Sequence, residues 1–364
     1  HQKIRVFQID TSNNVTLAAT LTADSSGATI PITNLNMHEV TYAQAGDVMF
    51  IAHQTFMVRK LVRTGLTSFQ METKTFDTQS AGAKIYQPYF QFQDLGVTLD
   101  PSASSGNGIT LTTSEDYWDL TGSQSGGDYP DSKHVGLTIK YHDQEITITS
   151  VQSATQATGN ALATLKKKLK VDSFRTDNGV ATITVTLVNH GFSAGDAFTV
   201  SNANTVGGIA ASNINGARTV VEVIDDNVFT FNAAANANDS VAGGGTPFLE
   251  THAPATNWSE QSYSVLRGFP GAVTFHQNRL WYAGTIAQPD GLWASKSNEF
   301  FNFDIGDASD NDSIDIRAAI GEVNTIKHLV SNRDLQAFTS TDEFIVPAFV
   351  EKPTTPTNAT IKRQ

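Results

Sequence analysis

The residues best suited to binding a hard cation lie in one acidic segment late in the chain. Five carboxylates fall within it: Asp304, Asp307, Asp310, Asp312 and Asp315. Clustered oxygen ligands of this kind suit calcium. The spacing is not that of an EF-hand loop, because no glycine follows Asp310-Asn-Asp at the required turn and no glutamate closes the loop. We therefore expect a solvated loop built on Asx turns, with the five carboxylates as calcium candidates and no assigned metal site.

The sequence offers no catalytic signature. It has nine histidines and no cysteine, which excludes disulfides, thiolate zinc sites and cysteine nucleophiles. No His-x-x-x-His, Gly-x-Ser-x-Gly or phosphate-loop pattern occurs. His53 and His276 each precede a glutamine at an expected strand turn, so turn hydrogen bonding is the interpretation for both. We predict a protein without catalytic residues or cofactor, and not an enzyme.

One pair of carboxylates keeps an enzymatic alternative open. Asp116 and Asp119 flank Tyr117 and Trp118, and glycoside hydrolysis needs two carboxylates beside a sugar-binding surface. The competing interpretation is that these aromatic residues belong to a core or an interface. The alternative function is a receptor-binding or glycan-hydrolysing protein.

A short run of lysines is the candidate for contact with DNA. It comprises Lys166, Lys167, Lys168 and Lys170. Lysines can meet phosphates by charge contact and counterion release. The chain carries 24 Lys+Arg against 36 Asp+Glu, a net charge of −12, so a solvated face or a salt bridge is the competing interpretation.

The elements that must position these residues are predicted to be β-strands. The clearest is 181–188, where Ile183, Val185 and Leu187 alternate with threonines and should face a core. The same alternation indicates further strands, paired as hairpins, at 136–141, 145–149 and 228–231. The segment 160–170 fits either a helix or a strand. The fold class is therefore all-β.

Three stretches share the order of an apolar strand, a short polar turn and a second strand: 46–61, 272–284 and 326–340. The last two are spaced like propeller blades, and two inserted domains would restore that spacing to the first. We predict a partial β-propeller with two small inserted β-domains. The expected boundaries are 1–95 for the first part of the platform, 96–170 and 171–245 for the inserts, and 246–364 for the rest of the platform.

Several segments resemble the tail nozzle family of short-tailed bacteriophages, also called tail tubular protein B. They are Gly46–His53 with Arg59–Arg63, Trp258–Thr285, Leu292–Phe303 and Arg333–Thr339. The resemblance implies a β-propeller with inserted β-domains, assembled as a homo-oligomer, expected to be a hexamer, around the DNA exit channel. It also implies a place in the virion tail, with the head-to-tail adaptor, the tail fibres and the viral double-stranded DNA as partners.

A second resemblance concerns the middle of the chain. Segments 188–200, 214–220 and 227–231 are similar to a small β-module that recurs in phage structural proteins. No run of about 18 apolar residues occurs, so no membrane segment is expected. The first residues do not look like an initiator segment or a signal peptide, and we expect the sequence to begin part-way through a longer polypeptide.

Overall fold

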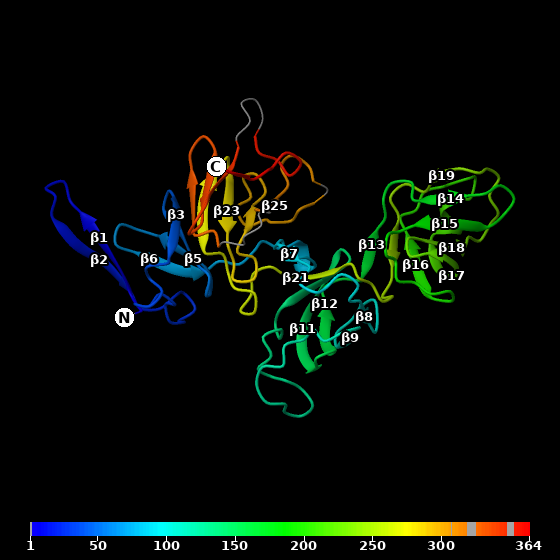
Figure 1. The fold of residues 1–364 in the computed structure, drawn as a ribbon, viewed down its shortest axis with the longest axis horizontal. Helices are drawn as coiled ribbons and strands as arrows, with labels where there is room; N and C mark the ends of the chain where they lie inside the picture. The colour runs from blue at the N-terminus through cyan, green and yellow to red at the C-terminus, as the bar shows by residue number, and fades with distance from the viewer. Residues whose placement is uncertain (1, 307, 319–324, 348–352) are drawn as a thin grey trace. The chain divides into compact units, whose positions relative to one another are not determined.

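The fold is built almost wholly from β-strands, as the sequence predicts (Figure 1). The computed structural model describes residues 2–306, 308–318, 325–347 and 353–364. The helical elements within these residues are α1 (Ala211–Ile214) and the 3-10 turn η1 (Ser80–Gly82). The chain divides into two compact units. Unit 1 comprises His1–Thr78, Ile85–Pro88 and Ser262–Gln364, and unit 2 comprises Gln79–Lys84 and Tyr89–Gln261.

Unit 1 contains three four-stranded antiparallel sheets, each with its strands in chain order, and one two-stranded hairpin. The hairpin consists of β1 (Ile4–Ile9) and β2 (Val15–Leu21). Blade 1 consists of β3 (Thr41–Ala45), β4 (Val48–His53), β5 (Phe56–Arg63) and β6 (Phe69–Thr73). Blade 2 consists of β22 (Ala272–His276), β23 (Arg279–Ala283), β24 (Gly291–Ala294) and β25 (Ile314–Arg317). Blade 3 consists of β26 (His328–Ser331), β27 (Leu335–Phe338), β28 (Glu343–Val346) and β29 (Lys362–Arg363).

The three blades meet along their first strands. Strand β22 lies against β3 of blade 1 and against β26 of blade 3. Two side chains of blade 1 also bond to the backbone of blade 2: Thr41 Oγ1 donates to Gly271 O at 2.8 Å, and Gln54 Nε2 donates to Gly284 O at 2.9 Å. First strands gathered side by side, with later strands further out, are the arrangement of a partial β-propeller.

Both faces of blade 2 are buried, because strand alternation sends neighbouring side chains to opposite sides. Trp281 and Leu292 join a core shared with blade 3, whereas Tyr282 and Trp293 join a core shared with blade 1. The aromatic segment after β24 completes the second core with Phe303, which is 2% exposed. The large aromatic content of this region therefore serves blade-to-blade packing.

Unit 2 contains two larger antiparallel sheets. The seven-stranded sheet has the order β7 (Tyr89–Phe90), β21 (Trp258–Gln261), β10 (Thr138–Tyr141), β11 (Gln144–Ser153), β12 (Gln156–Ala161), β9 (Ile109–Thr113) and β8 (Leu99–Pro101). The eight-stranded sheet has the order β13 (Lys166–Lys168), β20 (Phe248–Glu250), β16 (Ala197–Ser201), β17 (Gly216–Asp225), β18 (Val228–Asn232), β15 (Thr182–Thr186), β14 (Phe174–Thr176) and β19 (Ala242–Gly243).

The predicted strands of unit 2 are present. Ile183, Val185 and Leu187 are all buried in the core of the eight-stranded sheet. Strands β10 and β11 pair as one hairpin, and β17 and β18 pair as another. The ambiguous segment 160–170 holds the end of β12 and the whole of β13, and the backbone of β13 pairs with β20.

The two sheets of unit 2 reach beyond the segments 96–170 and 171–245. Strand β7 precedes residue 96 and β21 follows residue 245, yet both belong to the seven-stranded sheet. Strand β20 joins the eight-stranded sheet between β13 and β16. The chain returns to the blades at Ser262, which is 16 residues after the expected position 246.

Candidate functional site

Lys166, Lys167 and Lys168 form β13, at one edge of the eight-stranded sheet, and Lys170 follows this strand. Lys166 Nζ sits 4.9 Å from the centre of the Phe248 ring, and Lys167 Nζ is 3.1 Å from Asp143 Oδ1. Lys168 and Lys170 are exposed. Charged side chains on an edge strand discourage pairing with another sheet. Lys167 and the Lys168 backbone N–H, which donates to Asp143 Oδ2 at 3.1 Å, therefore attach the run to Asp143.

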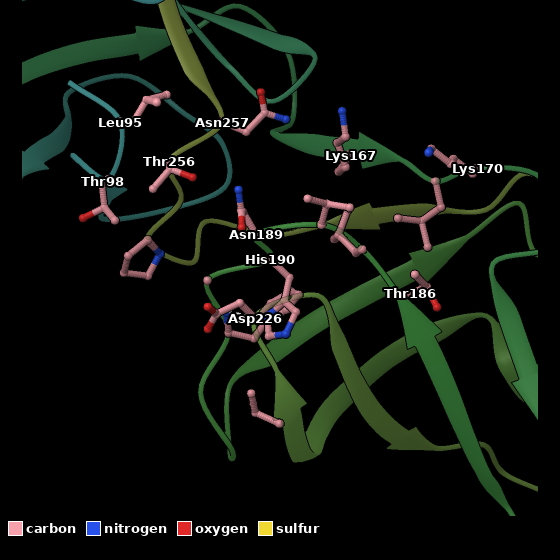
Figure 2. Close-up of a pocket in the computed structure, with 18 of the residues that line it drawn as sticks. Leu95, Thr98, Lys167, Lys170, Thr186, Asn189, His190, Asp226, Thr256 and Asn257 are labelled. Carbon is pink, nitrogen blue, oxygen red and sulfur yellow. Dashed lines mark hydrogen bonds between the residues drawn. The ribbon is translucent and has the colours of Figure 1, made fainter. Parts of the chain in front are cut away.

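Three of the lysines line a groove in unit 2 with a volume of about 980 Å³ (Figure 2). Lys167, Lys168 and Lys170 contribute to one wall. Leu95 and Thr98 come from the segment leading into β8, and Figure 2 shows them across the groove from Lys170. The groove is thus assembled from segments that lie far apart in the sequence.

Polar groups complete the lining. Asn189 and Asn257 offer amide donors and acceptors, and Asp226 is the acidic residue of this lining. The lysines outnumber that one carboxylate, so the wall formed by β13 favours anions. Lysine ammonium groups with nearby amides can contact phosphate or carboxylate oxygens. A groove with a single carboxylate lacks the acid and base pair that glycoside hydrolysis requires.

His190, at the groove, is a structural residue. It is 2% exposed, and its Nδ1 accepts a hydrogen bond from Phe192 N–H at 2.9 Å. Its Nε2 therefore carries the proton and donates to Asp225 O at 3.0 Å. Both ring nitrogens are thus occupied within the chain. The adjacent Gly191 has a φ of +69°, and an added Cβ would lie 1.6 Å from Pro254 O.

The acidic loop does not gather its carboxylates around a common point. Asp312 Oδ1 is 2.8 Å from Lys296 Nζ, and Asp312 Oδ2 accepts from Ser309 N–H at 2.8 Å. Asp315 pairs with Arg317, while burial raises the pKa of the Asp315 carboxyl. Over the described residues there is no group of three or more His, Asp or Glu side chains placed to hold a metal ion.

The backbone of the same loop surrounds a cation supplied by the chain itself. Arg279 is 2% exposed, and its Nη1 donates to Asp312 O at 2.5 Å while its Nη2 donates to Asp310 O at 2.8 Å. Asp304 lies at the start of the loop and is half-buried. The fifth calcium candidate, Asp307, lies outside the described residues. A guanidinium and the Lys296 ammonium therefore hold the described part of this loop.

The aromatic residues between Asp116 and Asp119 face inward. Trp118 is 3% exposed and joins the core of the seven-stranded sheet. Tyr117 donates its hydroxyl to Glu260 Oε2 at 2.6 Å. Asp119 accepts hydrogen bonds from Lys133 N–H and from the Thr121 hydroxyl. Tyr117 and Trp118 thus take part in the packing of the seven-stranded sheet.

The two turn histidines make hydrogen bonds close to their strands. His53 Nδ1 lies 2.9 Å from Thr55 Oγ1, and His276 Nδ1 lies 2.9 Å from Ser331 Oγ at the end of β26. Burial lowers the pKa of both imidazoles. His276 thereby links blade 2 to blade 3, whereas His53 stabilises its own turn.

His142 makes unit 2 sensitive to acid. It occupies the β10–β11 turn with a φ of +51°, and neither ring nitrogen has a hydrogen-bond partner among the described residues. Burial, with a smaller contribution from Lys167, lowers the pKa of His142 to about 4 from its usual 6.5. The His142 imidazole therefore binds a proton more tightly in the unfolded chain than in the folded one. The contribution of neutral His142 to the free energy of unfolding is therefore fully present above about pH 6.5, and it is lost as the pH falls towards 4.

Replacing His142→Asn is expected to remove this acid sensitivity, because asparagine tolerates a positive φ and carries no charge. The wild-type chain should lose about 3 kcal/mol more than the variant between pH 7 and pH 4. Urea unfolding of unit 2 at several pH values measures the difference. Replacing the exposed His252→Asn is the control and should leave the wild-type pH profile in place. Parallel profiles for wild type and His142→Asn would contradict the assignment.

Comparisons with known proteins leave the family open. No protein-family model matches the chain, and no curated protein matches it. Among solved structures, the chain is similar to a chain described as phage phi92 endosialidase, with 13% sequence identity and a TM-score of 0.21. The match covers 89% of this chain and 46% of that one, so this chain spans about half the length of the endosialidase.

Within the described residues, no helix is both long and apolar enough to cross a membrane.

Proposed function

We propose that the chain is a structural subunit of a phage tail nozzle, which continues the DNA channel, holds the packaged genome and lets it exit on infection. One observation supports this most directly. The chain builds one blade, runs through a β-rich unit of two sheets, and then builds two further blades beside the first. This is the arrangement that the resemblance of segments such as Gly46–His53 and Trp258–Thr285 implies.

The proposed mechanism is mechanical and needs no catalytic step. Blades joined by extensive apolar cores form a stiff platform, since close-packed interiors resist deformation. A ring of such subunits, proposed to be a hexamer, would bind the head-to-tail adaptor and the tail fibres. The net charge of −12 would keep DNA phosphates from adhering to most of the surface, and the exposed lysines of the groove would supply a few contacts.

Cryo-electron microscopy of the virion that contains this chain tests the proposal. Six copies encircling the channel between the adaptor and the tail tip would support it. A peripheral trimer bound to the outside of the tail would overturn it.

A contact between the groove and DNA has a measurable signature. The double variant Lys168→Glu with Lys170→Glu should weaken binding of a 20-base-pair duplex and reduce the salt slope, d log K/d log[salt], by about two units. Fluorescence anisotropy over a range of salt concentrations measures both changes. The matched control is Lys133→Glu, an exposed lysine in unit 2 outside the groove lining. Equal losses per replaced lysine in the two variants would show that the groove has no special role.

The groove also favours a second candidate function, the binding of an acidic receptor glycan. Its lysines could pair with carboxylated or sulfated sugars, and Asn189 and Asn257 could hydrogen-bond to hydroxyls. A glycan array probed with wild type and with the Lys168/Lys170 variant tests this. Binding of acidic glycans that the variant loses, without any duplex binding by wild type, would favour the receptor function over DNA contact.

A further inference from the structure

The β1–β2 hairpin at the start of unit 1 has two apolar faces. Its root face carries Ile4, Val6, Ala19 and Leu21, which pack against a small core that includes Met71 of blade 1. This packing attaches the hairpin to the rest of unit 1. Beyond the root, the two strands extend away from blade 1 (Figure 1).

A β-bulge reverses the apolar face along the hairpin. The register shifts between Val6, which pairs with Ala19, and Phe7, which pairs with Leu17. Neighbouring residues on a strand point to opposite faces, so Phe7 faces away from the side occupied by Val6. Bulges commonly redirect side chains in this way. The outer half of the hairpin therefore presents its apolar side chains away from the chain's own core.

The resulting outer face consists of two cross-strand pairs. Phe7 lies opposite Leu17, and Ile9 lies opposite Val15. Their exposed fractions are 55%, 55%, 65% and 62%, respectively. A two-stranded hairpin alone is marginally stable in water, and a contiguous apolar patch on it indicates an interaction surface. We call these four residues the hairpin patch.

We propose that the hairpin patch docks on a second copy of this chain, an inference that rests on the homo-oligomer of the proposed function. Charge supports this occupant. Arg5 shares the face of Phe7 and Ile9 by strand alternation, and the chain as a whole has a net charge of −12. Unit 1 also has exposed apolar and acidic residues, among them Ile305, which is 53% exposed, and Asp310.

The geometry suits a head-to-tail contact. A hairpin on one subunit and a different surface on the next generate a ring when the rotation closes. Each copy would then bury its hairpin patch on its neighbour and offer its own acidic and apolar surface to the copy on the other side. The outer half of the hairpin would gain its packing in the assembly.

Isotope-mixed photo-cross-linking tests this contact directly. The full chain carrying Ile9→p-benzoylphenylalanine is prepared in ¹⁴N and ¹⁵N forms, which are mixed, irradiated and digested. We expect cross-linked peptides that combine both isotopes. The matched control is Gln8→p-benzoylphenylalanine, whose side chain points to the opposite face, and it should yield few hybrid peptides. Cross-links within single isotopes only, or none, would overturn the inference.

Self-association provides a second readout. The double variant Phe7→Ser with Leu17→Ser should raise the dissociation constant of the oligomer at least tenfold by mass photometry. The adjacent pair Gln8→Ser with Thr16→Ser is the control, because it alters the same hairpin on its other face. Equal assembly of both variants would overturn the inference. A ring in the virion without hybrid cross-links would refute the hairpin contact alone, whereas hybrid cross-links without a ring around the channel would refute the nozzle alone.

Discussion

Replacing Gly191→Ala is expected to lower the melting temperature of unit 2 by about 10 °C. The alanine Cβ would lie 1.6 Å from Pro254 O, so the backbone must move. The φ of +69° adds a steric cost of about 1–2 kcal/mol for a residue with a Cβ. Together these effects should reduce the free energy of unfolding by about 3–5 kcal/mol, and each kcal/mol corresponds to about 2–4 °C at this size. Differential scanning calorimetry measures the shift.

The same loop contains a matched control. Gly195 also has a positive φ, of +96°, but an added Cβ there would meet no atom within 4 Å. Gly195→Ala should therefore show the conformational cost alone, about 1–2 kcal/mol. Equal destabilisation by the two variants would mean that the close approach of Gly191 to Pro254 is not maintained in solution.

Replacing Arg279→Met is expected to destabilise unit 1 by about 3–5 kcal/mol. The variant leaves the carbonyls of Ser295, Asp310 and Asp312 without the guanidinium that now donates to them at 2.7, 2.8 and 2.5 Å. Hydrogen bonds to a charged group contribute about 1.5–3 kcal/mol each, and losing the donor exposes the desolvation cost of each acceptor. The shift in the thermal unfolding transition of unit 1 measures the loss.

Two further variants separate shape from charge. Arg279→Lys keeps the charge but cannot present a planar fork to several carbonyls, so it should restore only part of the stability. Arg333→Met removes an arginine whose side chain is 84% exposed, and it should change the free energy of unfolding by less than about 0.5 kcal/mol. If Arg279→Met melted like Arg333→Met, the acidic loop would not depend on the guanidinium.

The sequence predicted the elements whose side chains alternate regularly. In β15 the apolar positions Ile183 and Val185 are fully buried, as their spacing indicates. The sequence around β13 does not decide between a helix and a strand, because the spacing of Leu165 and Leu169 suits both. Its pairing with β20, some 80 residues later in the chain, makes this segment a strand. Local periodicity cannot supply a distant partner.

The three similar stretches of sequence do not correspond to the same two strands in each blade. The stretch 46–61 corresponds to β4 and β5, the second and third strands of blade 1. The stretches 272–284 and 326–340 instead correspond to the first and second strands of blades 2 and 3. An apolar strand, a turn and another strand recur in any meander, so the pattern indicates blades without fixing the position within each.

The candidate sites depended on groups that side-chain spacing does not reveal. The acidic loop suggested calcium through its carboxylates, but Arg279 binds its backbone oxygens, which are present in every residue type. The groove escaped prediction because Thr98, Asn189 and Asn257 come from separate loops and form no motif in the chain. Of these lining residues, the sequence indicated a ligand contact for the lysines alone.

The junction between blades 1 and 2 also determines when the protein can fold. Thr41 bonds to Gly271 and Gln54 bonds to Gly284, and each pair is separated by 230 residues. At about 5–20 residues per second, a ribosome needs roughly 12–46 s to synthesise the chain between these partners. During that interval blade 1 has an uncovered apolar face, whereas unit 2 can form and bring the two ends together, which lowers the entropy cost of closure. Assembly of the propeller should therefore follow the folding of the insert.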